Sequence, residues 1–188
     1  MTKPTLVLIS GAPGTGKTVL LRKLAPVLSV VVLEKDAIKE ILFDTLGTGD
    51  REWSKKLGVT TFELLYMLIE GHLKARQSVL VEAGFHNKYA TSWLDEMRQK
   101  YDFDVLELHC YADPDTVRQR YIDRARSDER HPGHDSGVEL EAFADELRDR
   151  YAEYGSVTNG DSLIRVDTAD FTSVDYGEIT EIVRKAIR

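Results

Sequence analysis

The fold of this chain is decided by residues 5–18, which read TLVLISGAPGTGKT. The run begins with almost continuous apolar residues, which are typical of a strand that is buried on both faces of a parallel sheet. Behind the glycine-rich turn, apolar residues recur at helical spacing (Leu20, Leu21, Leu24, Val27), and Pro26 marks the weakening end of that helix. The sequence therefore predicts a strand, a turn and a helix in direct succession.

The turn between this strand and this helix fits the phosphate-binding pattern G-x-x-x-x-G-K-[ST]. Glycines at these positions let backbone N–H groups turn inward around phosphate oxygens, and the helix directs its positive N-terminal end at the same anion. The alternative is a chance glycine-rich turn, but eight consecutive residues fit in the correct context. The predicted nucleotide contacts are Gly11, Ala12, Pro13, Gly14, Thr15, Gly16, Lys17 and Thr18.

Two residues of this loop carry chemistry. Lys17 is expected to reach the β- and γ-phosphates and to act in catalysis, and the hydroxyl of Thr18 is expected to help hold Mg²⁺. The predicted ligands are therefore ATP, with GTP as an alternative, and Mg²⁺. The loop specifies nucleotide binding but does not specify the reaction that follows.

The rest of the chain repeats the alternation of strand and helix. Short apolar runs at 30–33, 79–81, 105–111 and 163–166 read as four further strands, and helical patterns follow them. This alternation predicts one α/β domain over residues 1–188, a three-layer α/β/α sandwich with a five-stranded parallel sheet. Ligands are expected outside the carboxyl ends of the strands.

Composition excludes several classes of protein. The apolar share of 42% and the charged share of 30% are ordinary for a folded globular chain, and no apolar run approaches the length of a membrane span. The net charge of −7 argues against a nucleic-acid partner and an anionic membrane surface. The expected location is the cytoplasm, and the single Cys110 is expected to be buried and inert.

Two other classes of phosphate-loop protein fit less well. A GTPase needs a base-reading Asn-Lys-x-Asp segment, and the nearest string, Asn87-Lys88-Tyr89-Ala90, lacks the acid. Ring-forming AAA+ ATPases usually have Asp-Glu at the end of a strand and a separate helical lid domain. Here the third strand ends Val81-Glu82-Ala83, and the chain is short for that extra domain. A kinase fits better.

Asp36 supplies the first kinase feature. It lies just past the second predicted strand and opens a helix, so its carboxylate is expected to project into the cleft opposite the phosphate loop. There it would position or deprotonate an acceptor hydroxyl during in-line phosphoryl transfer. The alternative is that Asp36 only caps its helix.

An arginine cluster supplies the second feature. Arginines crowd a predicted helix that runs from Asp113 to about Arg126 and leads into a Gly/Pro/His loop, which together predict a mobile lid at about 118–137. Its arginines would neutralise charge on the transferring group; Arg120 and Arg124 are the catalytic candidates and Arg130 is a nucleotide contact. The alternative is an exposed charged helix. The cluster comprises Arg118, Arg120, Arg124, Arg126 and Arg130.

The phosphate loop, Asp36 and the arginine-rich lid together resemble the small P-loop kinases, including gluconate kinase, shikimate kinase, chloramphenicol phosphotransferase, the polynucleotide kinase domain and zeta toxin. The likeness is greatest to the branch labelled as an AAA domain, and it covers nearly the whole chain. It implies the sheet order 2-3-1-4-5 and a residue at Asp36 that contacts the acceptor. It also implies lid arginines that contact ATP. An Asp is absent from the end of strand three, where Glu82 would substitute as a water-mediated Mg²⁺ ligand or face the acceptor pocket.

The predicted function is therefore an ATP-dependent kinase that phosphorylates a hydroxyl of a small-molecule acceptor. Open alternatives are a regulatory nucleotide-binding NTPase, a toxin-like kinase and a polynucleotide 5′-kinase. His131 and His134 are weak metal candidates and fit a lid contact or a turn better, whereas His86 is expected near the acceptor. Several aromatic residues are expected in the core, with the acceptor site as the alternative: Trp53, Phe62, Tyr66, Phe85 and Trp93.

Overall fold

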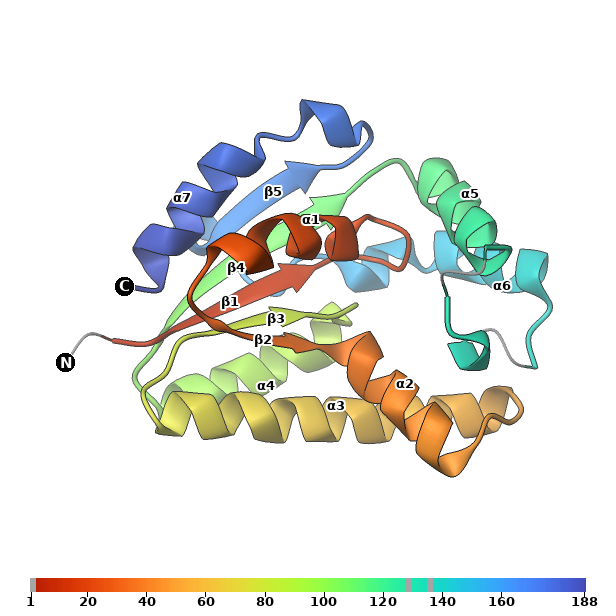
Figure 1. The fold of residues 1–188 in the computed structure, drawn as a ribbon, viewed down its shortest axis with the longest axis horizontal. Coiled ribbons are helices and arrows are strands. Elements are labelled where there is room, and N and C mark those ends of the chain that lie inside the picture. Colours follow the sequence, from red (N-terminus) through yellow and green to blue (C-terminus); the bar gives the residue numbers. More distant parts are fainter. Residues whose placement is uncertain (1–2, 128–129, 135–136) are drawn as a thin grey trace.

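The structure, a computed structural model, describes residues 3–127, 130–134 and 137–188. Its centre is a five-stranded sheet in which every pairing is parallel and the order is β2-β3-β1-β4-β5 (Figure 1). This confirms the predicted fold class and sheet order. The strands are β1 (Thr5–Ser10), β2 (Val31–Glu34), β3 (Val79–Glu82), β4 (Asp104–Tyr111) and β5 (Leu163–Asp167).

Helices cover both faces of the sheet, as Figure 1 shows. Alternate residues of β1 serve the two faces: Leu6 and Leu8 pack in the cluster with α3 and α4, whereas Val7 and Ile9 pack in the cluster with α1 and α7. Every residue of β1 is buried, so the apolar run of the sequence marks the central strand. The helices are α1 (Lys17–Leu24), α2 (Lys35–Leu46), α3 (Arg51–Lys74), α4 (Asn87–Lys100), α5 (Pro114–Ala125), α6 (Leu140–Asp149) and α7 (Tyr176–Ala186).

Some element boundaries differ from what the sequence pattern favours. The pattern favours one helix from about Val138 to Tyr154, whereas the structure has α6 followed by a 3-10 turn, η3 (Tyr151–Tyr154). Asn87 is by its residue type a possible N-cap of the next helix, but it is the first residue of α4; the N-cap is His86, which makes no side-chain capping bond. Asp113 begins α5 as expected, because its carboxylate accepts hydrogen bonds from the N–H groups of the first turn.

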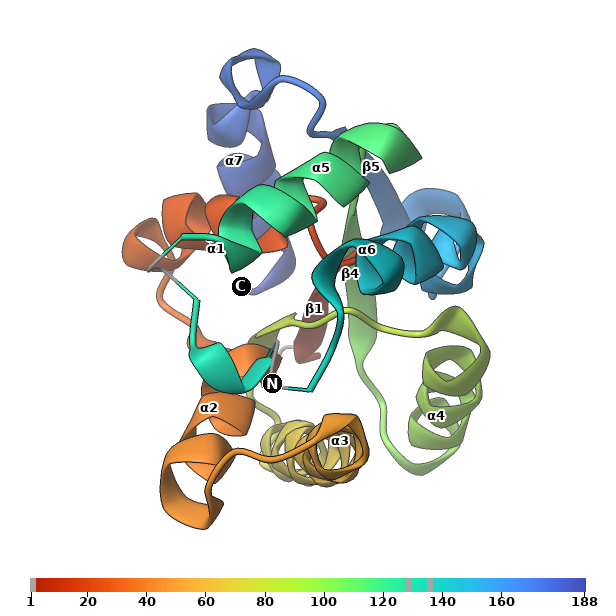
Figure 2. The same ribbon diagram turned by 90° about the vertical axis from the view of Figure 1, so that its right-hand side faces the viewer.

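Beyond the helices that cover the two faces, further elements lie at the carboxyl ends of the strands. Figure 2 looks at this end and shows α5 and α6 beside one another, with the short 3-10 turn η2 (Pro132–His134) between them and α2. Tyr121 and Ile122 of α5 pack against Ala144 of α6 in a small apolar cluster of their own. These elements enclose the edge of the sheet at which the phosphate loop lies.

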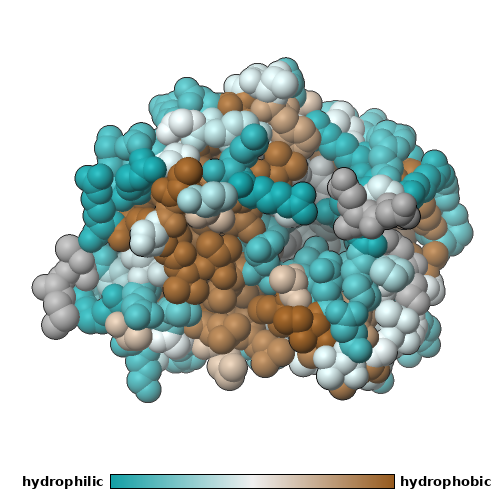
Figure 3. Space-filling view, viewed as in Figure 1, coloured by the Kyte–Doolittle hydropathy of each residue, from teal (hydrophilic) through white to brown (hydrophobic). Residues whose placement is uncertain are grey.

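The surface is mixed in character. Figure 3 shows an apolar area on the face that carries β2 and its neighbouring helices, and exposed apolar side chains of this part of the fold include Val27, Val31 and Leu68. None of the helices in the described ranges is long and apolar enough to cross a membrane. The apolar area lies along the edge strand and is separate from the carboxyl end of the sheet, where the charged residues of the candidate site meet.

Candidate active site

The phosphate loop joins β1 to α1 and depends on its glycines. Gly11, Gly14 and Gly16 have φ angles of +130°, +91° and +80°, which side-chain-bearing residues rarely adopt. A Cβ at Gly11 would lie 2.2 Å from the carbonyl oxygen of Cys110, and a Cβ at Gly14 would lie 2.7 Å from the carbonyl oxygen of Val117. The glycines therefore let the loop pass close to β4 and α5 while its backbone turns inward.

Lys17 is buried at the start of α1. Its Nζ donates a hydrogen bond to the carbonyl oxygen of Ala12, 3.0 Å away, and lies 3.9 Å from Oε1 of Glu82. Burial lowers the pKa of Lys17 and raises that of Glu82, and in each case the charge of the other residue opposes the shift. The ammonium keeps donor capacity for an arriving phosphate beyond its one bond inside the loop.

A magnesium ion fits this loop only together with the nucleotide. Thr18 follows Lys17 in α1 and is partly exposed, as a metal-ligating hydroxyl requires. Within the described residues, no group of three His, Cys, Asp or Glu side chains could hold a metal ion. Mg²⁺ commonly takes few protein ligands and completes its shell with phosphate oxygens and water, so the residues present fit that arrangement. Glu82 lies against Lys17, within the same buried charged group.

Asp36 is the second residue of α2 and does not cap it. The N-cap is Glu34, so the helix-cap alternative from the sequence is wrong. The Asp36 carboxylate instead accepts a hydrogen bond of 2.9 Å from Nζ of Lys35, and 48% of its side chain stays exposed. Burial alone would raise the pKa of Asp36, but the charge and hydrogen bond of Lys35 hold it well below its ordinary range. An ionised carboxylate that can accept hydrogen bonds thus lies at the edge of the site.

The arginines of α5 take different positions. Arg120 donates to the carbonyl oxygens of Thr168 and Ala169, each 2.9 Å away, in the segment after β5, and its guanidinium lies 4.5 Å from the ring centroid of Phe171. A Cβ at Gly16 would lie only 2.4 Å from the ring of Phe171, so this ring packs directly against the phosphate loop. Arg120 therefore borders the phosphate loop from the β5 side.

Arg124 faces the interior of the site. Its Nε is buried and has no hydrogen-bond partner among the described residues. Burial lowers the pKa of Arg124, the neighbouring Arg130 lowers it further, and the carboxylates of Asp36 and Glu82 oppose this. A desolvated guanidinium that interacts electrostatically with the carboxylates of Asp36 and Glu82 is well placed to bind an anion. The sequence named Arg120 and Arg124 as catalytic candidates but did not distinguish between them.

The other arginines of the cluster are mainly structural. Arg118 donates to Oδ1 of Asp145 at 2.6 Å, and Arg126 pairs with Glu141, so both tie α5 to α6. The charged-helix alternative thus describes these two residues. Arg130 lies over the ring of Tyr121, 4.7 Å from its centroid. Within the predicted lid, 118–137, residues 128–129 and 135–136 lie outside the described residues.

The turn after β3 is tied to η3. Nε2 of His86 lies 2.7 Å from Oε2 of Glu153, and a Cβ at Gly84 would lie 3.7 Å from the ring of Tyr154. The Nδ1 atom of His86 is buried and has no partner within the described ranges. Sequence reasoning placed His86 near the acceptor but missed Glu153 and Tyr154, because no motif connects residues so far apart.

The aromatic residues belong largely to the core. Phe85 is buried, and Phe62, Tyr66 and Trp93 pack around the same apolar cluster beneath the sheet. Trp53 instead donates its indole N–H to the carbonyl oxygen of Gly47, 2.9 Å away. The core interpretation therefore holds for four of the five predicted aromatics. Cys110 is buried as expected, and burial raises the pKa of its thiol to about 12.

A buried carboxylate that the sequence did not single out supports the base of the loop. Glu107 of β4 is fully buried and accepts hydrogen bonds from the hydroxyl of Ser10, the last residue of β1, and from the N–H groups of Val157 and Thr158. The hydroxyl of Thr158 donates to it as well, at 2.7 Å. Glu107 thereby joins the strand that enters the phosphate loop to the segment that follows η3.

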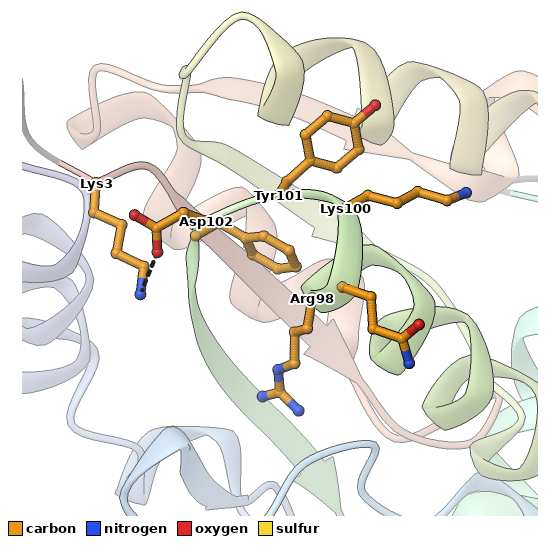
Figure 4. A pocket seen from close by; sticks show the side chains of 7 residues that line it. Lys3, Arg98, Lys100, Tyr101 and Asp102 are labelled. Carbon is orange, nitrogen blue, oxygen red and sulfur yellow. Dashed lines mark ion pairs between the residues drawn. The ribbon is translucent and has the colours of Figure 1, made fainter.

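A hollow on the surface lies away from these residues. It has a volume of about 500 Å³ and is lined by Lys3 and by the segment 98–103, at the amino ends of β1 and β4 (Figure 4). Figure 4 shows Lys3 paired with Asp102, with the other long side chains spread over an open surface. The phosphate loop is at the opposite end of the sheet, so this hollow is no part of the candidate site.

Comparisons with known proteins agree with this geometry. A family model described as an AAA domain matches residues 6–153. The crystal structure of a candidate kinase from Chloroflexus aurantiacus J-10-fl is 32% identical to this chain, with both chains covered completely and a TM-score of 0.88. No curated protein matches the sequence.

More distant structures share the fold. A sugar kinase from Janibacter sp. HTCC2649 is 15% identical, with 98% of this chain and 94% of that chain covered and a TM-score of 0.56. A gluconokinase from Sinorhizobium meliloti 1021 is 13% identical, with 100% of this chain and 93% of that chain covered and a TM-score of 0.54. At such identities the likeness describes the architecture alone, which is that of a P-loop kinase.

Proposed function

Because this chain belongs to the AAA domain family and has the fold of P-loop kinases, we propose that it is an ATP-dependent kinase that phosphorylates a hydroxyl of a small-molecule acceptor. GTP is the alternative donor. The observation that carries the proposal is the convergence of cations and carboxylates at one end of the sheet. Lys17 and Arg124 are buried or half-buried there, and the ionised Asp36 faces them from α2.

The donor half of the site would hold the phosphates. The backbone of Gly11–Gly16 would donate to the β-phosphate, Lys17 would reach between the β- and γ-phosphates, and Arg124 would approach the γ-phosphate from α5. Arg120 would lie on the far side of the loop beside Phe171, and Arg130 would add positive charge from the lid. Bound Mg²⁺, held by Thr18 and by water bound to Glu82, would neutralise phosphate charge.

The acceptor half would be organised by Asp36. In the transfer step the acceptor oxygen bonds to the γ-phosphorus while the bond from that phosphorus to the bridging oxygen breaks and ADP leaves. The carboxylate accepts a hydrogen bond from the attacking hydroxyl and so fixes its direction. Because the pKa of Asp36 is held low, the carboxylate orients the hydroxyl and receives its proton only as the new P–O bond forms.

Asp36→Asn tests this assignment. The substitution keeps the shape of the side chain and removes its charge, so phosphoryl transfer should fall by a factor of about 10² to 10⁴ while the affinity for ATP stays within a few-fold. Asp95→Asn is the matched control, because Asp95 is exposed on α4, away from the loop. Transfer is measured with radiolabelled ATP against sugars, sugar acids, nucleosides, antibiotics and nucleic-acid 5′-ends. If no acceptor on this panel is phosphorylated, the kinase proposal is wrong. If Asp36→Asn transfers phosphate at the normal rate, the role given to Asp36 is wrong.

A further inference from the structure

The described part of the lid is docked on α2. Phe43 of α2 is almost fully buried, and it belongs to neither of the clusters that pack on the sheet. The ring of His131 stacks on it with a centroid distance of 5.4 Å and an interplanar angle of 8°, and the ring of His134 meets it edge-on, also at 5.4 Å. Phe43 is thus covered from the lid side by residues that arrive nearly ninety positions later in the chain.

Gly133 makes this close approach possible. A Cβ at that position would lie 2.6 Å from Cγ of Phe43 and within 2.9 Å of two further atoms of the ring. These atoms belong to a rigid ring at the base of a buried side chain, so neither partner can yield without moving the lid or the helix. The requirement for glycine at residue 133 is therefore steric, and the three atoms nearest to a Cβ at that position all belong to Phe43.

Two polar contacts flank the ring. Nε2 of His131 lies 3.1 Å from Oδ1 of Asp44, and Nε2 of His134 lies 3.0 Å from Oε1 of Glu40. The N–H of Gly133 donates to Nδ1 of His131 at 3.0 Å, which assigns the proton of the neutral imidazole to Nε2 and lets it donate to Asp44. Glu40 and Asp44 are one helical turn apart, so both histidines contact the same face of α2.

The docking connects the two halves of the site. α2 carries Asp36 in its first turn, and the lid continues from α5, which carries Arg124. Figure 2 shows η2 lying between α5 and α2 at the carboxyl end of the sheet. η2 therefore lies between the helix that carries the arginine of the donor half and the helix that carries the carboxylate of the acceptor half.

We propose that Phe43 and the segment 130–134 form a latch that docks the lid on α2 and so positions Arg124 opposite Asp36. Phe43 and Gly133 are positioning residues in this latch, and His131 and His134 add the polar contacts. The inference rests on the proposed kinase function for its effect on transfer. The docking itself is independent of any reaction.

A double-mutant cycle tests the docking. Gly133→Ala introduces a clash with the ring, so backbone amide exchange in the segment 130–134 should accelerate by roughly tenfold or more, as expected for overpacking. Phe43→Ala removes both the ring and the clash, so adding Gly133→Ala to it should produce no further acceleration. Gly71→Ala is the matched control, because no atom lies within 4 Å of a Cβ there. Additive effects of the two substitutions, or unchanged exchange in Gly133→Ala, would overturn the latch.

Kinetics then test the consequence for the site. Gly133→Ala should lower kcat by about tenfold or more, because Arg124 is no longer held opposite Asp36, whereas the KM for ATP should rise by a smaller factor, because the phosphate loop is untouched and only the lid contact from Arg130 is weakened. Exchange is measured without turnover, so a failed kinase assay leaves the docking test intact, and the two proposals fail separately. If exchange accelerates but transfer is normal, the positioning role is wrong.

Discussion

Nζ of Lys17, at the start of α1, lies 3.9 Å from Oε1 of Glu82, the last residue of β3, and both side chains are buried. At this distance the two groups are an ion pair without a close hydrogen bond. Burial lowers the pKa of Lys17 and raises that of Glu82, and the charge of each residue opposes the shift of the other. A bound phosphate would add negative charge beside Lys17 and so favour its ammonium form.

The first prediction concerns that carboxylate. Glu82→Gln should raise the Mg²⁺ concentration needed for stabilisation by ATP by about 10- to 100-fold, the usual effect of losing an outer-sphere partner of a metal. The measurement is the ATP-induced shift in melting temperature over a magnesium titration. Glu34→Gln is the control, because Glu34 lies in register beside Glu82 on β2. An unchanged magnesium midpoint would restrict Glu82 to its contact with Lys17.

The second prediction concerns the phosphate loop. Gly14→Ala combines a φ of +91° with a Cβ 2.7 Å from the carbonyl oxygen of Val117, so it should abolish measurable ATP binding. Gly160→Ala has a φ of +62° but open space around its Cβ, so it should cost about 1–2 kcal/mol of unfolding free energy and leave ATP binding intact. Isothermal titration and urea unfolding compare the two. Equal ATP affinities would show that the loop tolerates a side chain at residue 14.

The third prediction concerns the buried carboxylate of β4. In Glu107→Gln an amide NH₂ would face the N–H groups of Val157 and Thr158, so the unfolding free energy should fall by about 3–5 kcal/mol, the cost typical of disrupting a buried charged network. Asp104→Asn, at an exposed carboxylate that pairs with Lys3, should cost no more than about 1 kcal/mol. Urea titrations of both variants decide this. A small loss in Glu107→Gln would contradict the structural role given to Glu107.

The fourth prediction concerns pH and the latch. Burial lowers the pKa of His134 to about 3 in the docked lid, against an ordinary 6.5 when the lid is released. Released His134 therefore binds a proton more readily, so docking is strongest above pH 6.5 and weakens as the pH falls, by up to tenfold per pH unit. The charged or titratable groups that face His134 are Glu40, Asp36, Lys35 and Lys39 on α2 and Arg130 and His131 in the lid.

Amide exchange in 130–134, corrected for the intrinsic pH dependence of exchange, measures this effect. Wild-type docking should weaken between pH 7 and pH 5, and in His134→Asn that pH dependence should disappear because no proton is taken up on release. Asp36 should not contribute, since its carboxylate stays ionised throughout that range. If exchange in His134→Asn depended on pH as strongly as in the wild type, a group other than His134 would control the docking of the lid.

The sequence by itself determined the frame and the donor half of the site. An apolar run followed by a glycine-rich turn leaves few conformations, because the strand must be buried and positive φ angles fall on glycine. The alternation of strands and helices then placed Asp36 and the arginine helix at the same edge of the sheet. These inferences needed only local spacing and the rule that parallel strands end together.

Tertiary structure alone decided what distinguishes residues of the same type. Arg118, Arg120 and Arg124 lie on the same helix and look alike in the sequence. In the structure Arg118 pairs with Asp145 of α6, and Arg120 donates a hydrogen bond to the segment after β5. Arg124 is instead desolvated, and the carboxylate of Asp36 interacts with its charge. The contacts of Glu107 with Thr158 and of Phe43 with Gly133 join segments far apart in the chain. No local pattern encodes such contacts, because they depend on distances and burial that exist only once the sheet and its helices have packed.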